Sequence, residues 1–322
     1  MSIRQSKNGL DTSLPFPAIM RGYSDRALTP IVIYLVVSLF ATIVEKFLAT
    51  GSEYKFPFPL FTAFFQLLIT AVLMRAWEVL GKMTSFRVRA TGWDRATATR
   101  IVPLSCVYVC LIVVDIHFLQ TVPPTLYLIV RAISIPISIL LSLRWLHQTV
   151  SSFMQGMCIA IIIGLWLASD GLLALSTRGI FWGLIYATLI AVYSVLIKNS
   201  LVVVHQDIWR LLYYYISMAI PMMGVILWIS GESSRIRKEV YFLDEFGFWF
   251  QMVIAAIIGF VVNATMIRLV KLTSPLIHCI SMTTKGCLQV FTIAILMDNP
   301  LHFQHTVGIL MALISCFICS FA

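Results

Sequence analysis

Two basic residues, Arg131 and Lys285, stand inside long apolar stretches of the chain. Arg131 lies within residues 127–136 and Lys285 within residues 280–287. A cation at bilayer depth costs roughly 2.5–3.5 kcal/mol on insertion scales, so such residues usually face a watery cavity and serve a ligand. A guanidinium can contact phosphate oxygens with two parallel donors, and an ammonium adds a mobile point charge. The pair therefore favours an anion with more than one negative group, such as a diphosphate.

The alternative role for either cation is an ion pair with an acid in the same apolar region. Glu45 and Asp115 are the candidate acids. Asp115 and His117 are two residues apart, so they do not share a helix face, and a structural or gating role for Asp115 is favoured over a proton relay. We expect Lys285 and Arg131 to contact substrate phosphate, and an ion pair for one of them stays open.

Several polar and aromatic residues in apolar segments are further candidates for ligand contact. Tyrosine suits a nucleobase pocket because its ring stacks and its hydroxyl forms hydrogen bonds. Three consecutive tyrosines at 213–215 point in different directions around a helix, so at most two can line one cavity. The alternatives are an aromatic belt at the membrane surface and hydrogen bonds between helices. The candidate ligand-binding residues are Tyr214, Tyr213, Gln66, Asn263, Thr284 and Ser281.

The composition of the chain excludes most soluble classes. Hydrophobic residues make up 60% of the 322 residues and charged residues only 11%, with a mean hydropathy of +0.93. A soluble domain is nearer half apolar and a quarter charged. The sequence therefore predicts an all-α, polytopic membrane protein surrounded by membrane lipids.

The net charge of +9 does not indicate a nucleic-acid partner, because the basic residues are spread over loops that border apolar segments. All seven cysteines lie in apolar segments and are interpreted as small core residues. We expect no nucleic-acid partner, no cofactor and no bound metal. A homodimer is left open.

Apolar runs of about 20 residues, the length that a transmembrane helix needs, occur ten times. Charged residues or the helix breakers proline and glycine separate them. Nine spans are the main alternative. In span 5, Gly156 and Gly164 share one face, which predicts a close helix contact there. The ten predicted spans are 29–49, 58–80, 101–119, 124–145, 151–169, 179–198, 208–230, 247–269, 273–297 and 303–322.

The distribution of lysine and arginine predicts the orientation of these spans. With the N-terminus in the cytosol, 15 of the 23 basic residues lie on the cytosolic side and 6 on the opposite side. Cytosolic loops carry an excess of Lys and Arg, so we expect both termini in the cytosol.

Ten spans divide into two groups of five, and an odd group must insert upside down when it is duplicated. This is the inverted-repeat architecture of many secondary transporters. Arg131 and Lys285 would then occupy equivalent spans, 4 and 9. We expect a cytosolic tail over 1–28 and one transporter domain over 29–322, with repeats at 29–169 and 179–322.

Seven segments of the chain form a recognisable series. In order, they are Pro59–Gln66, Val102–Ser105, the Arg131 segment, His147–Thr149, Ile208–Leu211 and Thr273–His278, followed by the Lys285 segment. This series resembles the nucleotide-sugar transporters of the drug/metabolite transporter superfamily, and most of all their Golgi GDP-fucose members. The resemblance covers roughly residue 30 to the end.

The resemblance implies a ten-helix transporter that is not an enzyme. It implies antiport of a cytosolic nucleotide sugar, with GDP-fucose or another GDP-sugar as first expectation, for the lumenal nucleoside monophosphate, GMP. Lys285 matches the family's span-9 lysine that faces phosphate, and Arg131 its span-4 arginine. Gly286 stands where sugar-phosphate translocators usually have a second basic residue. The implied location is the Golgi membrane, with the endoplasmic reticulum membrane as the alternative.

One departure concerns the base. GDP-sugar transporters commonly carry Phe-Tyr-Asn-Asn in span 7, whose asparagines help to read guanine, whereas this chain has Tyr213-Tyr-Tyr-Ile216. A UDP-sugar or a sugar phosphate is therefore an open alternative substrate. A membrane-embedded enzyme is disfavoured, because the sequence holds only Asp244-Glu245 and scattered acids.

Overall fold

The computed structural model describes residues 16–47, 54, 56–83, 93–121, 124–147, 150–168, 177–296 and 303–321. The described residues form helices and no strands. Residues 170–176 of the predicted boundary between the two repeats, 170–178, and residues 1–15 of the predicted tail lie outside them. The eleven helices are α1 (Phe16–Lys46), α2 (Pro59–Met83), α3 (Arg95–Thr121), α4 (Pro124–Trp145), α5 (Ser152–Leu167), α6 (Thr177–Val203), α7 (Ile208–Ser230), α8 (Glu232–Glu239), α9 (Phe246–Leu272), α10 (Pro275–Leu296) and α11 (Phe303–Phe321).

Ten of these helices correspond one to one with the predicted spans. Helices suit an apolar environment because every backbone polar group finds its partner inside the same segment. Two differences from the sequence analysis stand out. α1 begins at Phe16, inside the predicted tail, and the short helix α8 was not predicted.

Eight helices within the described residues are long and apolar enough to cross a bilayer by length and composition. The two predicted spans that do not meet this measure are α5 and α10. α5 has 16 described residues, fewer than the roughly 20 that a span needs. α10 carries Lys285 and a series of hydroxyl side chains, which lower its hydropathy. The protein is thus a multi-pass, all-helical membrane protein, with eight spans supported by composition.

The boundaries of α7 show why the sequence located this helix so well. The carboxylate of Asp207 accepts hydrogen bonds from the backbone N–H groups of Trp209 and Arg210 and so caps the N-terminus. At the other end Gly231 adopts φ of 70°, a left-handed conformation that glycine accepts without strain. Cap residues of this kind are readable from the sequence, and span 7 was predicted at 208–230.

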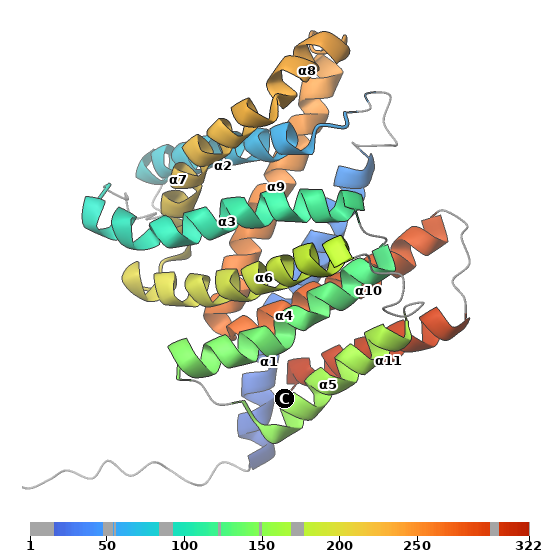
Figure 1. The fold of residues 1–322 in the computed structure, drawn as a ribbon. Helices are drawn as coiled ribbons and strands as arrows, with labels where there is room; N and C mark the ends of the chain where they lie inside the picture. The colour runs from blue at the N-terminus through green and yellow to red at the C-terminus, as the bar shows by residue number, and fades with distance from the viewer. Residues whose placement is uncertain are drawn as a thin grey trace, which may run out of the picture.

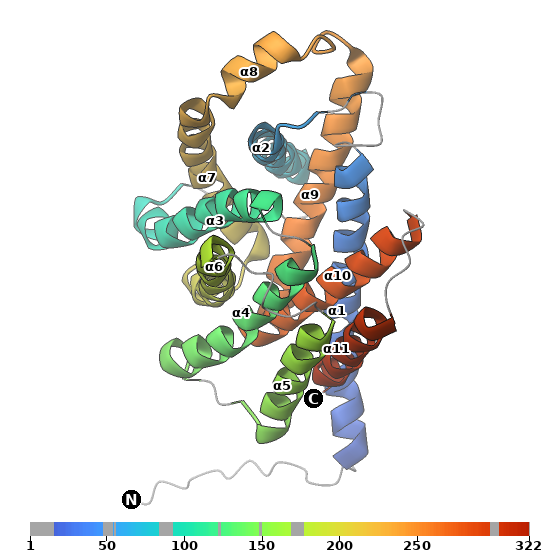
Figure 2. The same cartoon turned by 45° about the vertical axis from the view of Figure 1, so that its right-hand side comes forward.

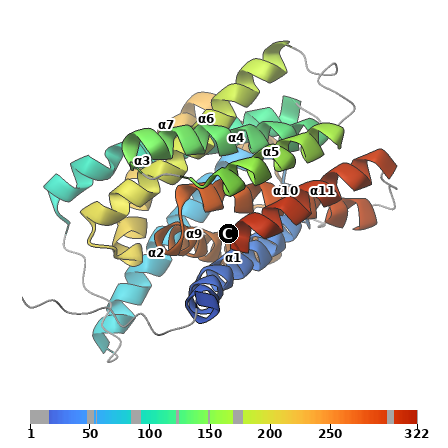
Figure 3. The same ribbon diagram turned by 90° about the horizontal axis from the view of Figure 1, so that it is seen from below.

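The helices pack in paired contacts. Figure 1 shows α3, α6, α4 and α5 stacked from top to bottom. Figure 2 shows α1 and α9 running side by side, and Figure 3, from below, shows α5 beside α11. α4 packs against α10, and α2 against α7. The contacts of α3 with α6 and α7 are matched by contacts of α9 with α1 and α2.

α5 and α11 approach each other through two glycines. A Cβ atom on Gly164 would lie 2.9 Å from the carbonyl oxygen of Gly308, and one on Gly308 would lie 2.5 Å from the backbone nitrogen of Ala168. The close contact predicted for Gly164 is therefore present. The prediction for Gly156 was wrong, because a Cβ there would meet no atom within 4 Å.

We predict that Gly308→Ala lowers the free energy of unfolding by about 1–3 kcal/mol, because the new methyl group collides with backbone that has no rotamer to change. Gly156→Ala is the matched control. It should be neutral or stabilise by up to about 1 kcal/mol, since Ala favours helix and the space is open. Thermal unfolding of both variants in detergent tests the pair. Equal melting temperatures would contradict the packing described for α5 and α11.

Candidate functional site

A cavity of about 650 Å³ opens near the end of the bundle where α1 ends and α2 begins. This volume lies within the range of pockets that hold small molecules and cofactors. The cavity is lined by α1, α2, α3 and α9, with one residue from α10. The lining residues are Thr42, Glu45, Lys46, Phe56, Pro57, Pro59, Thr62, Ala63, Gln66, Leu67, Thr70, Tyr108, Ile112, Asp115, Ile116, Gly259, Asn263 and Gln289.

The lining residues follow helical spacing. In α3, Tyr108, Ile112 and Asp115 are four and three residues apart and share one face. In α9, Gly259 and Asn263 are likewise four apart. The sequence analysis did not single out Tyr108. The available signal was a tyrosine two turns from an acid inside an otherwise apolar span.

Two of the predicted ligand-binding residues, Gln66 and Asn263, lie in the cavity wall. A Cβ on Gly259 would lie 3.3 Å from the Gln66 Oε1 atom, so the absence of a side chain at Gly259 makes room for this amide. Gln66 shares this wall with Glu45. Asn263 accepts a hydrogen bond from the Tyr215 hydroxyl at 3.0 Å. The wall thus holds two amides.

Arg131 lies on α4 and is 5% exposed. Its guanidinium carbon lies 5.0 Å from the centroid of the Tyr127 ring. Its Nη2 atom donates a long, 3.4 Å hydrogen bond to the Tyr186 hydroxyl. Its Nε atom is buried and has no hydrogen-bond partner among the described residues. A buried guanidinium has five N–H donors, so this one is left with unused donor capacity.

Asp115 does not form an ion pair with Arg131. The Tyr127 hydroxyl stands between them, because it donates to Asp115 Oδ1 at 2.6 Å and lies 2.7 Å from the Tyr186 hydroxyl. In the described part of the chain, the ion pair with charged atoms within 4.0 Å joins Arg75 and Glu78 on α2. Asp115 is therefore linked to Arg131 through the hydroxyls of Tyr127 and Tyr186.

Lys285 lies on α10 and is half-buried. It makes no hydrogen bond and no ion pair within 4.0 Å with another described residue. It does interact electrostatically with Arg131, Glu45 and Asp115. Neither cation lines the cavity, although both acids do. The two cations thus lie near the cavity with incomplete compensation of their charge.

Gly286 allows α10 to approach Arg131. A Cβ at this position would lie 2.5 Å from Leu128 Cδ2 and 3.6 Å from Arg131 Nη1. A side chain as large as lysine would meet α4 directly. The glycine next to Lys285 is therefore explained by close packing of α4 and α10.

The remaining α10 candidates differ from each other. Ser281 is buried, and its hydroxyl has no hydrogen-bond partner among the described residues. The Thr284 hydroxyl donates to the carbonyl oxygen of Ile280 at 2.9 Å. Ser281 therefore has unused capacity near Lys285, whereas the Thr284 hydroxyl is engaged within α10.

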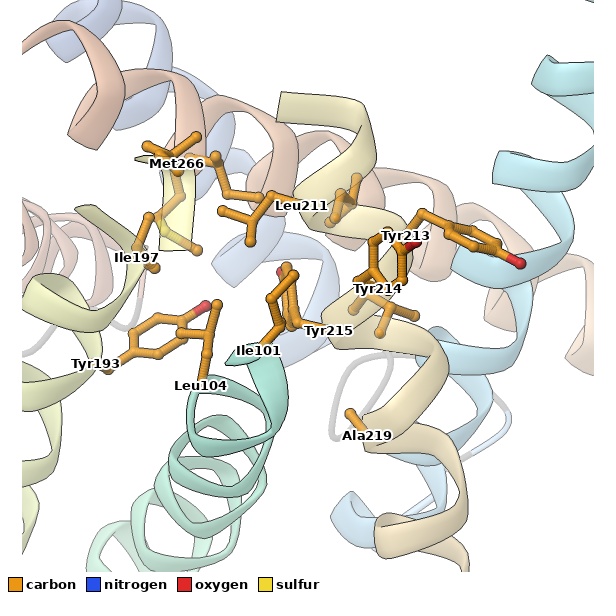
Figure 4. Close-up of a cluster of buried hydrophobic side chains, with 14 of the residues drawn as sticks. Ile101, Leu104, Tyr193, Ile197, Leu211, Tyr213, Tyr214, Tyr215, Ala219 and Met266 are labelled. Carbon is orange, nitrogen blue, oxygen red and sulfur yellow. The ribbon is translucent and has the colours of Figure 1, made fainter. Parts of the chain in front are cut away.

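Tyr213 and Tyr214 lie outside the cavity lining, in a packed cluster where α2 ends and α3 begins. Figure 4 shows Tyr213 extending towards α2, whereas Tyr215 points to the opposite side, towards Tyr193. The Tyr213 hydroxyl accepts a hydrogen bond from Arg75, which also lies over its ring at 4.8 Å. Tyr214 is fully buried, and its hydroxyl accepts from the backbone N–H of Asp94 at 2.8 Å.

Asp94 also starts α3. Its carboxylate accepts hydrogen bonds from the backbone N–H groups of Ala96 and Thr97 and from the Thr97 hydroxyl. These bonds lower the pKa of the Asp94 carboxyl, with the Thr97 hydroxyl contributing most. Tyr214 is thereby attached to the N-cap of a neighbouring helix, and the cluster closes the end of the bundle opposite the cavity.

Some known proteins are similar to this chain in sequence, and a solved structure is similar to it in fold. It is 29% identical over 286 residues to a GDP-fucose transporter 1 from Dictyostelium discoideum, covering 88% of this chain and 77% of that protein. It is 28% identical to a Golgi GDP-fucose transporter from Drosophila melanogaster, covering 80% of this chain and 78% of that protein. This chain is related to the nucleotide-sugar transporters. The resemblance inferred from the sequence is thereby confirmed.

A solved structure of 12% sequence identity shares the fold, with a TM-score of 0.62 over 93% of this chain and 97% of its own. No family model matches the chain. Both relatives quoted above are named as transporters. These names agree with the expectation that the chain is not an enzyme.

We predict that Tyr214→Phe lowers the free energy of unfolding by about 1 kcal/mol, because the N–H of Asp94 loses its acceptor. Tyr241→Phe is the matched control, since Tyr241 is 90% exposed, and it should change nothing measurable. Chemical unfolding of both variants in detergent makes the comparison. Ligand affinity should be measured alongside, because a Tyr214 that stacked on a nucleobase would lose about 1–3 kcal/mol of binding on replacement by Ala.

Proposed function

We propose that this protein is a nucleotide-sugar antiporter, which moves a cytosolic nucleotide sugar into the Golgi lumen in exchange for a nucleoside monophosphate. The single observation that carries the proposal is a pair of cations, Arg131 and Lys285, with unused donors beside a cavity of about 650 Å³. The names of the relatives support a GDP-sugar, GDP-fucose first. GMP is the nucleoside monophosphate that we propose as the returning ligand.

The cations suit a phosphate chain better than an uncharged ligand. In a bundle of low polarity an unpaired positive charge is costly, and an anion with two negative groups relieves both residues at once. Arg131 is held by Tyr127 and Tyr186 with its Nε atom free of protein partners among the described residues. Lys285 has the mobility to follow a phosphate that Arg131 orients.

The cavity acids give the empty carrier its counter-charges. Glu45 and Asp115 line the cavity and interact with Lys285 at a distance beyond an ion pair. Substrate phosphates must therefore replace this diffuse compensation by direct contact. A movement of α1 or α3 that takes an acid away from Lys285 would accompany binding. Ser281, with its unused hydroxyl, completes the phosphate side of the proposed site.

The architecture that fits this activity is a five-plus-five inverted repeat of ten spans. The paired contacts support it, because α3 with α6 and α7 has its counterpart in α9 with α1 and α2. In this arrangement α4 and α10 are equivalent, and they bring Arg131 and Lys285 together. The packed Tyr213 and Tyr214 cluster closes one end while the cavity opens at the other. Alternating access then exchanges the open and the closed end.

The exchange reaction gives the direct test of the proposed function. Proteoliposomes loaded with GMP should take up labelled GDP-fucose several times faster than vesicles loaded with buffer. The reason is that outward transport of GMP returns the binding site to the outer face of the vesicle. An excess of external UDP-sugar or sugar phosphate should compete weakly. Strong competition by one of these would assign the transporter to that substrate, and uptake equal to protein-free vesicles would contradict the proposal.

We further propose that both termini are cytosolic in the Golgi membrane, because basic residues favour that side 15 to 6. Epitope tags at either end should bind antibody after selective permeabilisation of the plasma membrane. Labelling of both tags only after the Golgi membrane is opened would reverse the orientation.

Co-staining with endoplasmic reticulum and Golgi markers in the same cells decides between the two compartments.

A further inference from the structure

A chain of hydrogen bonds connects the cavity wall to Arg131. Asp115 of α3 lines the cavity, and its Oδ1 atom accepts from the Tyr127 hydroxyl at 2.6 Å. The Tyr127 and Tyr186 hydroxyls lie 2.7 Å apart, and the Tyr186 oxygen accepts from Arg131 Nη2 at 3.4 Å. The two tyrosines and the arginine are buried. Three hydrogen bonds thus link a carboxylate in the wall to a guanidinium that does not line the cavity.

Each hydrogen bond in this chain has one direction. A phenol carries one proton, a guanidinium only donates, and a carboxylate only accepts. Tyr127 gives its proton to Asp115, so Tyr186 is the donor in the bond between the two hydroxyls. The Tyr186 oxygen then accepts from Arg131. Every donor points from the cation towards the acid, and the charges at the two ends polarise all three bonds in the same sense.

The aromatic rings that carry these hydroxyls are fixed by packing. The rings of Tyr127 and Tyr186 stack at 5.5 Å with an interplanar angle of 28°. The ring of Phe118 lies 5.7 Å from the first and 5.6 Å from the second. Gly183 lets α6 come this close, since a Cβ there would lie 2.9 Å from Val130 Cγ2 of α4 and 3.4 Å from Phe118 Cζ of α3. Three helices therefore hold the two hydroxyls in place.

The chain leaves a defined part of the Arg131 guanidinium unused. The Nη2 atom donates to Tyr186, the guanidinium lies over the Tyr127 ring, and the buried Nε atom has no hydrogen-bond partner among the described residues. A long side chain that is already held at one donor loses less conformational freedom when a ligand binds its other donors. The fixed arrangement therefore favours binding of an anion by the remaining N–H groups.

We propose that Asp115, Tyr127 and Tyr186 are positioning residues of the phosphate site, which hold Arg131 so that its free donors meet a phosphate group of the ligand. The proposal rests on the nucleotide-sugar transport proposed above and adds to it residues that act on phosphate through the arginine. Because the chain ties α3 to α4 and α6, the movement that takes an acid away from Lys285 on binding is made by α1.

The test measures the affinities of GMP and guanosine for the purified full-length protein in detergent and compares their ratio among variants. Tyr186→Phe keeps the stacked ring and removes the hydroxyl that Arg131 contacts. It should weaken GMP binding about fivefold and leave guanosine binding unchanged, because only the phosphate depends on the guanidinium. Tyr127→Phe should weaken GMP binding in the same direction. It interrupts the chain at Asp115 while the carboxylate stays, so no charge in the cavity changes.

The double variant Tyr127→Phe, Tyr186→Phe distinguishes a linked chain from two independent contacts. In a linked chain the double variant should bind GMP no more weakly than Tyr186→Phe alone, whereas the losses from independent contacts would add. Melting temperatures without ligand show which variants fold, and a general loss of structure weakens both ligands together. If Tyr186→Phe does not fold, the GMP-to-guanosine ratio of Tyr127→Phe decides.

Tyr193→Phe is the matched control. Tyr193 lies seven residues further along α6 and is likewise buried, but its hydroxyl bonds no residue of the chain. The variant should keep the wild-type ratio of GMP to guanosine affinity. A loss as large as that in Tyr186→Phe would show that removal of any buried hydroxyl from α6 has this effect, and would contradict the inference.

Two further results would overturn the inference. One is the wild-type ratio in both Tyr127→Phe and Tyr186→Phe. The other is tighter binding of GMP by Tyr186→Phe, since an arginine released from the chain would then serve the phosphate better. Both results leave the transport proposal intact as long as wild type binds GMP more tightly than guanosine. Equal affinity of wild type for the two ligands would overturn the transport proposal and this inference with it.

Discussion

Arg131 and Lys285 place two positive charges inside a bundle of mostly apolar side chains, and the surrounding structure has to compensate these charges. Lys285 has no hydrogen bond and no ion pair with another described residue, and Arg131 keeps an unpartnered Nε atom. Such charges raise the free energy of the folded protein unless something compensates them. The ring of Tyr127 and the hydroxyl of Tyr186 compensate Arg131, and Glu45 and Asp115 interact with Lys285 from beyond ion-pair distance. This partial compensation leaves both cations available for an anion.

Close packing brings the cations together. Gly286 lets α10 lie against Leu128 and Arg131 of α4, and the pair Gly164 and Gly308 lets α5 lie against α11. Without a hydrophobic driving force between helices in lipid, small residues of this kind permit the van der Waals contact that holds a bundle together. Position 286 therefore matters for the site through its lack of a side chain.

Much of the fold could be predicted from the sequence, because long apolar runs and cap residues are local signals. Span 7 was predicted from its apolar run at 208–230, which are the bounds of α7, and the capping residues Asp207 and Gly231 explain why the helix ends there. α8 was missed, because an eight-residue polar helix has no apolar run to reveal it. Gly156 and Gly164 looked equivalent in sequence, yet only Gly164 faces another backbone. Which face of a helix meets a neighbour depends on tertiary packing.

The residues of the candidate site could likewise be predicted only in part from the sequence. A charge in an apolar span is visible in the sequence, so Arg131 and Lys285 were singled out, as were Gln66 and Asn263 in the cavity wall. Tyr108 was not, because its spacing of two turns from Asp115 does not by itself show which helices share a cavity with it. The three tyrosines of α7 point to different surroundings. None of them lines the cavity, and only tertiary packing shows that Tyr215 bonds the lining residue Asn263.

The most direct test of this account compares the affinity of guanosine, GMP and GDP-fucose for folded wild type and for Lys285→Ala, measured by calorimetry. Lys238→Ala is the control, since Lys238 is exposed on α8. The account predicts that Lys285→Ala weakens GMP and GDP-fucose at least about tenfold, as expected for a hydrogen bond to a charged group, while guanosine binds both proteins equally weakly. Unchanged affinity for the two phosphorylated ligands in Lys285→Ala would contradict it.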